Sequence, residues 1–374
     1  MRKLSITILL ASALFNTSVA NACTTLIFKD NQGGVYQGRT MEFGDGLPQM
    51  YLNYYPVASK FKAYAPSGST PLSYTAKYAF LATVAKADKT NQLAAFDGIN
   101  TQGLTMTVNA FLAQSKFVDS PSKSNVLDSD GLGQWILSQF ATVDEVKNFL
   151  PKQAIWFEPT ILMGLKFPFH IAVFDRSGKG IVIEYVNGKL MINDNPVGVM
   201  TNGPEFSWHL TNLDNYTTLS NVGNGISKWN GEVLHQVDIG GNTLGLPSDD
   251  SSSGRFVRAA FYTNYAVKPS PDNAVAVLGK IMNKFDRIKG VTSTNSASTE
   301  ALSNAKSPQT FPSEWTVFTT LRDLNHNVYY IRTENNLNYT QFNLNAIAKN
   351  AKPFSISFDS LYKPNILSQE SGSN

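Results

Sequence analysis

Residues 20–28 read Ala20-Asn21-Ala22-Cys23-Thr24-Thr25-Leu26-Ile27-Phe28 and contain the only cysteine of the 374-residue chain. The small residues Ala20 and Ala22 form a cleavage pattern typical of exported proteins. Cleavage after Ala22 would make Cys23 the first residue of the mature protein. Its thiol would then lie beside a free α-amine, whose pKa of about 7.7–8.0 suits a general base near neutral pH. We therefore expect Cys23 to be a nucleophile that supplies its own base.

A leader precedes this junction. Arg2 and Lys3 supply positive charge, and an apolar stretch follows over residues 4–15. This order is typical of a signal peptide, so we predict a leader over residues 1–22 and a single mature domain over residues 23–374. The apolar run is shorter than the roughly 20 residues that span a membrane, and no later segment reaches that length. We expect a protein without a membrane span, located in the periplasm or secreted.

A lone cysteine in an exported chain has four possible states. It is paired between chains, lipidated, buried and inert, or reactive. A lipoprotein anchor prefers a larger aliphatic residue three positions before the cysteine, where this chain has Ala20. A reactive thiol is favoured, and the rival interpretations are a lipid-anchored structural protein and an exported binding protein with a degenerate site.

The composition is that of a globular protein rich in strand formers. Hydrophobic residues make up 42% of the chain, and its 23 Phe and 15 Tyr favour strands. With a net charge of +3 and 16% charged residues, no basic run interleaved with aromatics supports a nucleic-acid partner. The four histidines have no metal-ligand spacing, and no Walker loop or dinucleotide fingerprint is present. We expect no cofactor and no metal.

The sequence predicts a hairpin directly after the junction. Two β-forming runs, Cys23–Phe28 and Val35–Arg39, flank a turn rich in glycine. If Asn31 to Gly34 form a four-residue loop, Asp30 pairs with Val35, and the same register sets Cys23 opposite Glu42. A carboxylate would then face the new N-terminus, whereas Arg39 would lie on the other face of the strand. A slip of one residue would exchange the two faces.

Further hairpins and a few helices predict a layered α+β fold with mostly antiparallel sheets. Thr142 and Glu145 form a capping box, and Ser270-Pro271 opens another helix. The expected helices cover residues 132–140, 142–150 and 270–288. The expected strand pairs join residues 95–100 with 103–111, 169–175 with 180–186, 184–186 with 189–191, and 314–323 with 328–333.

Three blocks of sequence follow one another along the chain. They are Cys23-Thr24-Thr25 through Gly38-Arg39-Thr40-Met41-Glu42; Asn195 to Pro204 with Trp208-His209-Leu210-Thr211-Asn212-Leu213; and Gly245-Leu246-Pro247 with Ser253-Gly254-Arg255-Phe256. In this order they resemble the choloylglycine hydrolase family, whose members include bile salt hydrolases and penicillin V acylases. The resemblance covers nearly the whole mature chain.

The resemblance implies the N-terminal nucleophile hydrolase fold, a four-layer αββα sandwich, and cleavage of linear amides through a cysteine acyl-enzyme. Cys23 then corresponds to the nucleophile, Arg39 to the arginine beside it and Arg255 to a second active-site arginine. Asn202 corresponds to an asparagine that helps hold the substrate carbonyl and the new amine. Two arginines near the thiol would favour the thiolate, and asparagine amides can stabilise an oxyanion.

Two positions depart from the family pattern. Glu42 stands where the family commonly has aspartate, so it carries the same charge on a longer side chain. Asn109 lies one position before the place of the oxyanion-hole asparagine in the family's bile salt hydrolases. If Ala110 is the true equivalent, its backbone N–H would serve instead. A cysteine–histidine pair with His170 or His209 as base is a further alternative.

The substrate follows only in outline from the resemblance. The family hydrolyses bile salts conjugated to glycine or taurine, penicillin V and, in some exported members, long-chain acyl homoserine lactones. We expect a small-molecule N-acyl amide of one of these kinds, with no cofactor. Family members often form dimers or tetramers, so a homo-oligomer is also expected.

Overall fold

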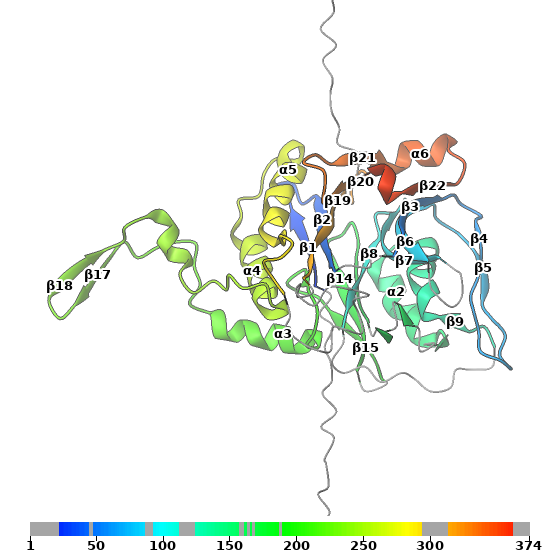
Figure 1. Cartoon of the computed structure of the whole chain (residues 1–374), viewed down its shortest axis with the longest axis horizontal. Helices are drawn as coiled ribbons and strands as arrows, with labels where there is room; N and C mark the ends of the chain where they lie inside the picture. Colours follow the sequence, from blue (N-terminus) through cyan, green and yellow to red (C-terminus); the bar gives the residue numbers. More distant parts are fainter. Residues whose placement is uncertain are drawn as a thin grey trace, which may run out of the picture.

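The fold consists of two stacked sheets with helices on both outer faces. The computed structural model describes residues 22–44, 48–86, 93–111, 124–156, 161–162, 165–166, 169–186, 189–293 and 313–361. In Figure 1, α4 and α5 lie on one side, followed by the sheet that contains β1 and β2, the sheet that contains β7 and β8, and then α2. This arrangement is the predicted αββα sandwich, and its two main sheets are antiparallel throughout.

The first sheet contains the strand that begins with the candidate nucleophile. Among the described residues it has six strands, in the order β16 (Val199–Met200), β1 (Cys23–Lys29), β2 (Val35–Phe43), β19 (Trp315–Asp323), β20 (Val328–Thr333) and β21 (Thr340–Asn343).

The second sheet has eight strands in the described part of the chain. Their order is β15 (Lys189–Asp194), β14 (Gly180–Val186), β13 (Phe169–Phe174), β8 (Thr105–Ala110), β7 (Leu93–Asn100), β6 (Phe80–Lys86), β3 (Met50–Tyr55) and β22 (Phe354–Ser357). Three predicted strand pairs are confirmed in this sheet, namely residues 95–100 with 103–111, 169–175 with 180–186, and 184–186 with 189–191. The fourth, residues 314–323 with 328–333, is confirmed in the first sheet.

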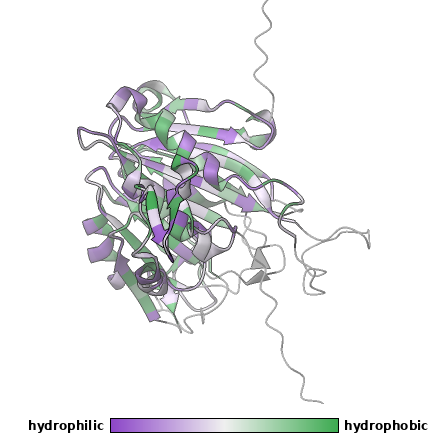
Figure 2. Ribbon diagram, turned by 90° about the vertical axis from the view of Figure 1, so that its left-hand side faces the viewer, coloured by the Kyte–Doolittle hydropathy of each residue, from purple (hydrophilic) through white to green (hydrophobic). Residues whose placement is uncertain are grey.

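The helices cover the outer faces of the two sheets. Helices α4 (Ser252–Tyr265) and α5 (Pro271–Met282) pack on the first sheet, and α1 (Leu132–Gln139) and α2 (Val143–Phe149) pack on the second. Because β2 has a glycine at position 38, α5 approaches it closely, and a Cβ atom there would lie 2.5 Å from the sulfur of Met282. Figure 2 shows hydrophobic residues gathered within the body and hydrophilic ones on its outer helices and loops.

The predicted helices are confirmed, with shorter ends. Thr142 caps α2 by accepting from the backbone N–H of Glu145 at 3.2 Å, as the capping box requires. Helix α5 starts at Pro271 and ends at Met282, followed by one 3₁₀ turn. In the described part of the chain, the other helices are α3 (Phe206–Asn212), α6 (Leu344–Asn350) and α7 (Phe358–Leu361), with 3₁₀ turns at Ser129–Gly131, Leu150–Lys152, Leu213–Tyr216, Ile239–Thr243 and Asn283–Phe285.

The predicted register of the first hairpin is wrong by one residue. Lys29 pairs with Val35 and Cys23 pairs with Met41, so Cys23 does not lie opposite Glu42. The cause is Asp30, which belongs to the turn. One of its carboxylate oxygens accepts from the backbone N–H groups of residues 32 and 34, each at 2.8 Å. A turn held in this way has five residues instead of four.

One hairpin stands apart from the body. It consists of β17 (Ile226–Trp229) and β18 (Glu232–His235), and every residue of both strands is exposed. Figure 1 shows it at the far end of an extended arm. The remaining short strands are β4 (Lys60–Lys62), β5 (Ser73–Thr75), β9 (Leu127–Asp128), β10 (Ile155–Trp156), β11 (Ile161–Leu162) and β12 (Leu165–Lys166).

The predicted leader falls almost wholly on residues 1–21, which lie outside the described residues. The single mature domain over residues 23–374 stays a prediction. Within the described parts of the chain, no helix combines the length and apolar character that crossing a membrane requires.

Candidate active site

Cys23 lies at the start of β1, with its side chain between the two sheets. The nearest cation is Arg39, whose Nη2 lies 3.7 Å from the thiol sulfur. The same nitrogen donates to the carbonyl of Val108 in the second sheet at 2.8 Å. Because Cys23 pairs with Met41, Arg39 is two residues away from that partner on β2 and shares the face of the thiol. A regular pleat therefore brings Arg39 to Cys23, and the prediction that Arg39 lies on the other face of the strand is wrong because the register differs by one residue.

Sequence reasoning missed Met41. Its sulfur lies 3.5 Å from the Cys23 sulfur and 3.1 Å from Nη2 of Arg39. The thioether thus contacts both the thiol and the guanidinium. The alternation of side chains along β2 would have identified this residue once the register was correct.

The surroundings of the Cys23 thiol disfavour its ionisation. Burial raises the pKa of Cys23 above its usual value of 9.0, and the negative charge of Glu42 acts in the same direction. Arg39 and Arg255 lower the pKa of the thiol, as expected, but burial outweighs them. Two nearby arginines therefore do not by themselves produce a thiolate, so attack by this sulfur needs a base.

Asn202 connects the nitrogen of Cys23 to the second sheet. Its Oδ1 accepts from the backbone nitrogen of Cys23 at 2.7 Å and from Nη2 of Arg255 at 2.8 Å. Its Nδ2 donates to the carbonyl of Ala110 at 2.9 Å. The sequence-predicted Asn202 is therefore in the site, and its oxygen accepts from the backbone nitrogen of the candidate nucleophile.

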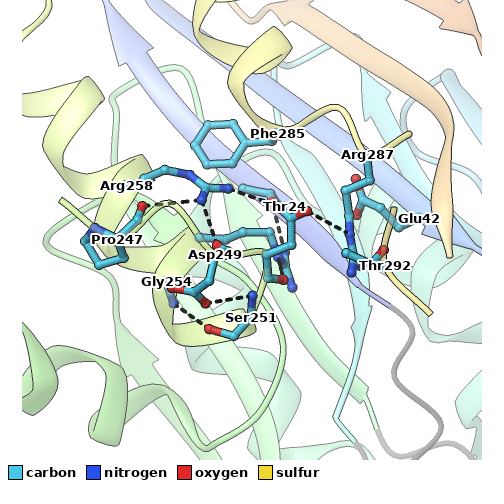
Figure 3. Close-up of polar contacts among 12 residues, drawn as sticks. Thr24, Glu42, Pro247, Asp249, Ser251, Gly254, Arg258, Phe285, Arg287 and Thr292 are labelled. Atoms are coloured by element: carbon cyan, nitrogen blue, oxygen red, sulfur yellow. Dashed lines mark hydrogen bonds and ion pairs between the residues drawn. The ribbon is translucent and has the colours of Figure 1, made fainter. Parts of the chain in front are cut away.

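Arg255 lies on the face of β1 that is covered by α4, opposite the thiol. Its Nη1 donates to the Cys23 carbonyl at 2.6 Å and to the hydroxyl of Thr24 at 2.7 Å. Arg255 is on α4, whose first turn is fixed by Ser251, because this side chain accepts from the N–H of Gly254 at 3.1 Å. Figure 3 shows Ser251, Gly254 and Arg258 around this helix start, near Thr24. Arg255 is a fixed, buried cation rather than a solvated surface residue.

Glu42 is buried on the opposite face of the sheet from the thiol. Its backbone N–H donates to the carbonyl of Ala22 at 2.9 Å, and Thr316 donates to its Oε1 at 3.0 Å. Its Oε2 has no hydrogen-bond partner among the described residues. Burial raises the pKa of Glu42, whereas the charges of Arg255 and Arg287 lower it. Figure 3 shows Glu42 beside Arg287.

Asn109 also lies between the sheets, but its side-chain amide forms a hydrogen bond with a backbone carbonyl. Its Nδ2 donates to the carbonyl of Thr201 at 2.7 Å, and its Oδ1 has no partner among the described residues. The next residue, Ala110, uses its carbonyl to hold Asn202. Whether Asn109 or the N–H of Ala110 completes an oxyanion hole stays a prediction.

Neither histidine of the cysteine–histidine alternative contacts the thiol. His170 is buried and pairs with the carboxylate of Glu184. Nε2 of His209 lies 2.8 Å from the carbonyl of Asn202. Burial lowers the pKa of both rings, that of His209 to about 4. In the described part of the chain, no three His, Cys, Asp or Glu side chains converge to hold a metal.

Glu314 should make the stability of the protein depend on pH. Burial raises its pKa to about 7, opposed by Arg287, whose Nη1 donates to it at 2.9 Å. Between pH 4.5 and 7 the folded state holds a proton that the unfolded state releases, so the contribution of Glu314 to stability falls as pH rises.

Glu314→Gln removes this titration. We compare the free energy of unfolding of the variant with that of the wild type. From pH 4.5 to pH 7.5, we expect this difference to change by about 3 kcal/mol in favour of the variant. Urea denaturation of both proteins across this range measures the gain. A difference between the two proteins that stays constant with pH would contradict the buried, protonated carboxyl.

The family follows from a match over most of the chain. The description "Linear amide C-N hydrolases, choloylglycine hydrolase family" matches residues 23–352, so the match begins at the candidate nucleophile. The chain belongs to the choloylglycine hydrolase family. This identification confirms the resemblance found in the sequence. The protein is therefore an enzyme, an amide hydrolase.

Relatives align with about three quarters or more of the chain. The conjugated bile acid hydrolase of Lactobacillus gasseri is 29% identical over 88% of this chain and 98% of its own. The penicillin V acylase of Pectobacterium atrosepticum is 28% identical over 73% of this chain and 68% of its own. A crystal structure of a conjugated bile acid hydrolase variant from Clostridium perfringens superposes with a TM-score of 0.76, at 25% identity over 90% of this chain and 97% of that one. The predicted N-terminal nucleophile hydrolase fold is confirmed.

Proposed function

We propose that this protein is an exported amidohydrolase that cleaves N-acyl amides through the thiolate of Cys23. The observation that carries the proposal is the convergence on one residue. Arg39 approaches its sulfur, Asn202 accepts from its nitrogen, and Arg255 donates to its carbonyl. Three polar side chains thus contact the sulfur, the nitrogen and the carbonyl of Cys23 and fix their orientation. A cysteine that only packs in a core behaves as a small apolar side chain and does not need such polar contacts.

The reaction begins with a proton transfer within Cys23. The neutral α-amine of the mature protein takes the thiol proton, and the sulfur attacks the amide carbonyl to form a tetrahedral oxyanion. The second amide hydrogen of Asn202 and the segment Asn109–Ala110 stabilise this oxyanion. The C–N bond then breaks, the α-ammonium returns the proton to the leaving amine, and a thioester remains on Cys23. Water activated by the same amine hydrolyses the thioester and releases the acid.

Glu42 acts on the α-amine in this scheme. Removal of the leader takes away the carbonyl of Ala22, which accepts from the Glu42 N–H in the full-length chain. The mature nitrogen becomes an ammonium with two additional N–H groups. The buried Oε2 of Glu42 is without a hydrogen-bond partner among the described residues. As a carboxylate oxygen it can accept from this ammonium, whose charge is opposite. Glutamate thus replaces the usual aspartate of the family.

Conjugated bile acids and penicillin V are the proposed substrates. The support is the names of the relatives, which are conjugated bile acid hydrolases, bile salt hydrolases and a penicillin V acylase. An N-acyl homoserine lactone with a long acyl chain is the alternative, because it presents the same linear amide to the thiol. All three groups share a secondary amide between an apolar acyl group and a small polar amine.

A substrate panel tests the proposal. Amine release is measured from glycocholate, taurocholate, penicillin V and a long-chain acyl homoserine lactone, with the mature protein and with its Cys23→Ser variant. We expect release from at least one compound by the wild type, and a loss of at least about 10³-fold in the variant. Release that is equal in both proteins would contradict the cysteine mechanism.

A homo-oligomer is also part of the proposal. The hairpin β17–β18 exposes Ile226 and Trp229 at 61% and 70% of their surfaces, although a two-stranded hairpin alone is marginally stable in water. Apolar side chains on such an arm favour burial against another copy of the chain. Light scattering of the mature protein tests this, since a monomer at micromolar concentration would contradict it.

A further inference from the structure

Asn202 is held at its backbone as firmly as at its side chain. Its N–H donates at 2.9 Å to the hydroxyl of Ser252, the first residue of α4, the helix that carries Arg255 into the site. Its carbonyl oxygen is 2.8 Å from Nε2 of His209 on α3. The residue that meets the nitrogen of Cys23 is thus held between the first residue of α4 and the middle of α3.

The contact with His209 fixes the tautomer of the ring. A carbonyl oxygen only accepts, so Nε2 of His209 must carry the hydrogen. The other nitrogen, Nδ1, is buried and has no hydrogen-bond partner among the described residues. A second proton there would be left without an acceptor. His209 is therefore a neutral donor, in agreement with a pKa that burial lowers to about 4.

The ring itself has little freedom to move. His209 is fully buried, and its ring stacks on that of Phe256 at a centroid distance of 4.6 Å and an angle of 15°. Phe256 follows Arg255 on α4, so the same helix supports the ring and supplies the cation that contacts Asn202. The groups whose charge acts on the ring are His170, Glu184 and Arg255.

We propose that His209 is a positioning residue for hydrolysis: it fixes the peptide of Asn202 so that Oδ1 of this side chain receives the nitrogen of Cys23. This inference rests on the proposed function, in which that nitrogen is the general base. His209 does not touch the thiol and takes no proton from it. Its effect passes through a single hydrogen bond to the Asn202 carbonyl.

The loss of this bond should displace Asn202. A buried carbonyl without a donor is unfavourable, so the segment would turn to find another partner. Asn202 Oδ1 would then no longer accept from the α-ammonium, whose pKa would fall because an acceptor favours the charged form. A displacement of about 1 Å can reduce turnover up to 100-fold.

Two variants separate the donor from the shape of the ring. His209→Gln keeps an N–H donor at a similar reach, whereas His209→Met fills a similar volume without one. With the best compound of the panel, we expect His209→Met to lower kcat by roughly 10–100-fold with little change in KM, and to move the acidic limb of kcat/KM to lower pH. His209→Gln should recover most of the kcat and the wild-type pH profile.

Two controls distinguish failure of the positioning role from failure of the proposed function. His326→Met, at an exposed histidine in the turn after β19, should leave kcat and the pH profile unchanged. If Cys23→Ser retains activity, the proposed function is wrong. If Cys23→Ser is inactive and His209→Met has wild-type kcat and pH profile, the positioning role is wrong.

The tautomer of His209 can also be measured in the wild-type protein, so this test does not depend on the folding of a variant. Nitrogen-15 NMR of histidine-labelled protein should show one imidazole with hydrogen on Nε2, unchanged from pH 8 to pH 5. A buried histidine at position 209 with hydrogen on Nδ1 would overturn the proposal, because Nε2 could then not donate to the Asn202 carbonyl.

Discussion

Replacing Cys23 with alanine is expected to reduce amide hydrolysis by roughly 10⁴-fold or more, to the background of the assay. The substitution removes the sulfur that forms the thioester. It leaves the α-amine, Arg39, Asn202 and Arg255 in place. Because these groups can still bind the substrate, we expect the variant to bind the best compound of the panel with an affinity within about threefold of KM. Initial rates and a binding titration measure the two effects.

The fold of this variant should be intact. The change from cysteine to alanine removes one atom from a position at the edge of the core, where the thiol contacts Met41 and Arg39. We expect a melting temperature within a few degrees of the wild type. Turnover at more than a hundredth of the wild-type rate in a protein of confirmed mature mass would contradict the assignment of the nucleophile.

Removing Asp97 should have the largest effect on stability. Asp97 on β7 forms a fully buried ion pair with Arg322 on β19, and so joins the two sheets. Its Oδ2 also accepts from the hydroxyls of Thr320 at 3.1 Å and Tyr329 at 3.0 Å. Asp97→Ala leaves a guanidinium charge in the core without its counter-ion. We expect a loss of about 3–5 kcal/mol in the free energy of unfolding, measured by urea denaturation.

Matched variants isolate the cause of this loss. The pair of Lys147 and Asp194 has side chains 42% and 74% exposed, so Asp194→Ala should cost under about 1 kcal/mol. The double variant Asp97→Ala with Arg322→Met should be more stable than Asp97→Ala, because the unpaired charge is gone. If Asp97→Ala costs no more than Asp194→Ala, the inter-sheet ion pair does not stabilise the fold.

The elements with strong local signals could be predicted from the sequence. The cap at Thr142, the proline at the start of α5 and the turn-bounded strand pairs all formed where the pattern indicated. These signals act over a few residues and do not depend on distant contacts. The order of the motifs also indicated the family, and with it the αββα arrangement that local patterns alone leave open.

The register of β1 and β2 could not be predicted reliably, and it changed the site. A turn of five residues instead of four moved the partner of Cys23 from Glu42 to Met41. Arg39 therefore shares the face of the thiol, and Glu42 lies on the helix side with Arg255. The choice depended on hydrogen bonds from Asp30 within the turn, for which the sequence offered only an ordinary turn signal.

The balance of charge and burial was equally hidden from the sequence. Two arginines beside a cysteine suggested a thiolate, but burial raises the pKa of this thiol in the full-length chain. The partners of Asn109 and His209 are backbone carbonyls at residues 201 and 202, which no side-chain motif records. Such contacts arise only when β8, α3 and the segment after β16 meet.

The central claim is that Cys23, as the first residue of the mature enzyme, carries the acyl group during turnover. Rapid quenching of the reaction in acid, followed by intact-mass and peptide mass spectrometry, tests it most directly. We predict a population whose mass is raised by the acyl group, with the addition confined to the thiol of an N-terminal peptide that begins at Cys23. Turnover without such an adduct in single-turnover quenching, or an adduct on another residue, would contradict the account.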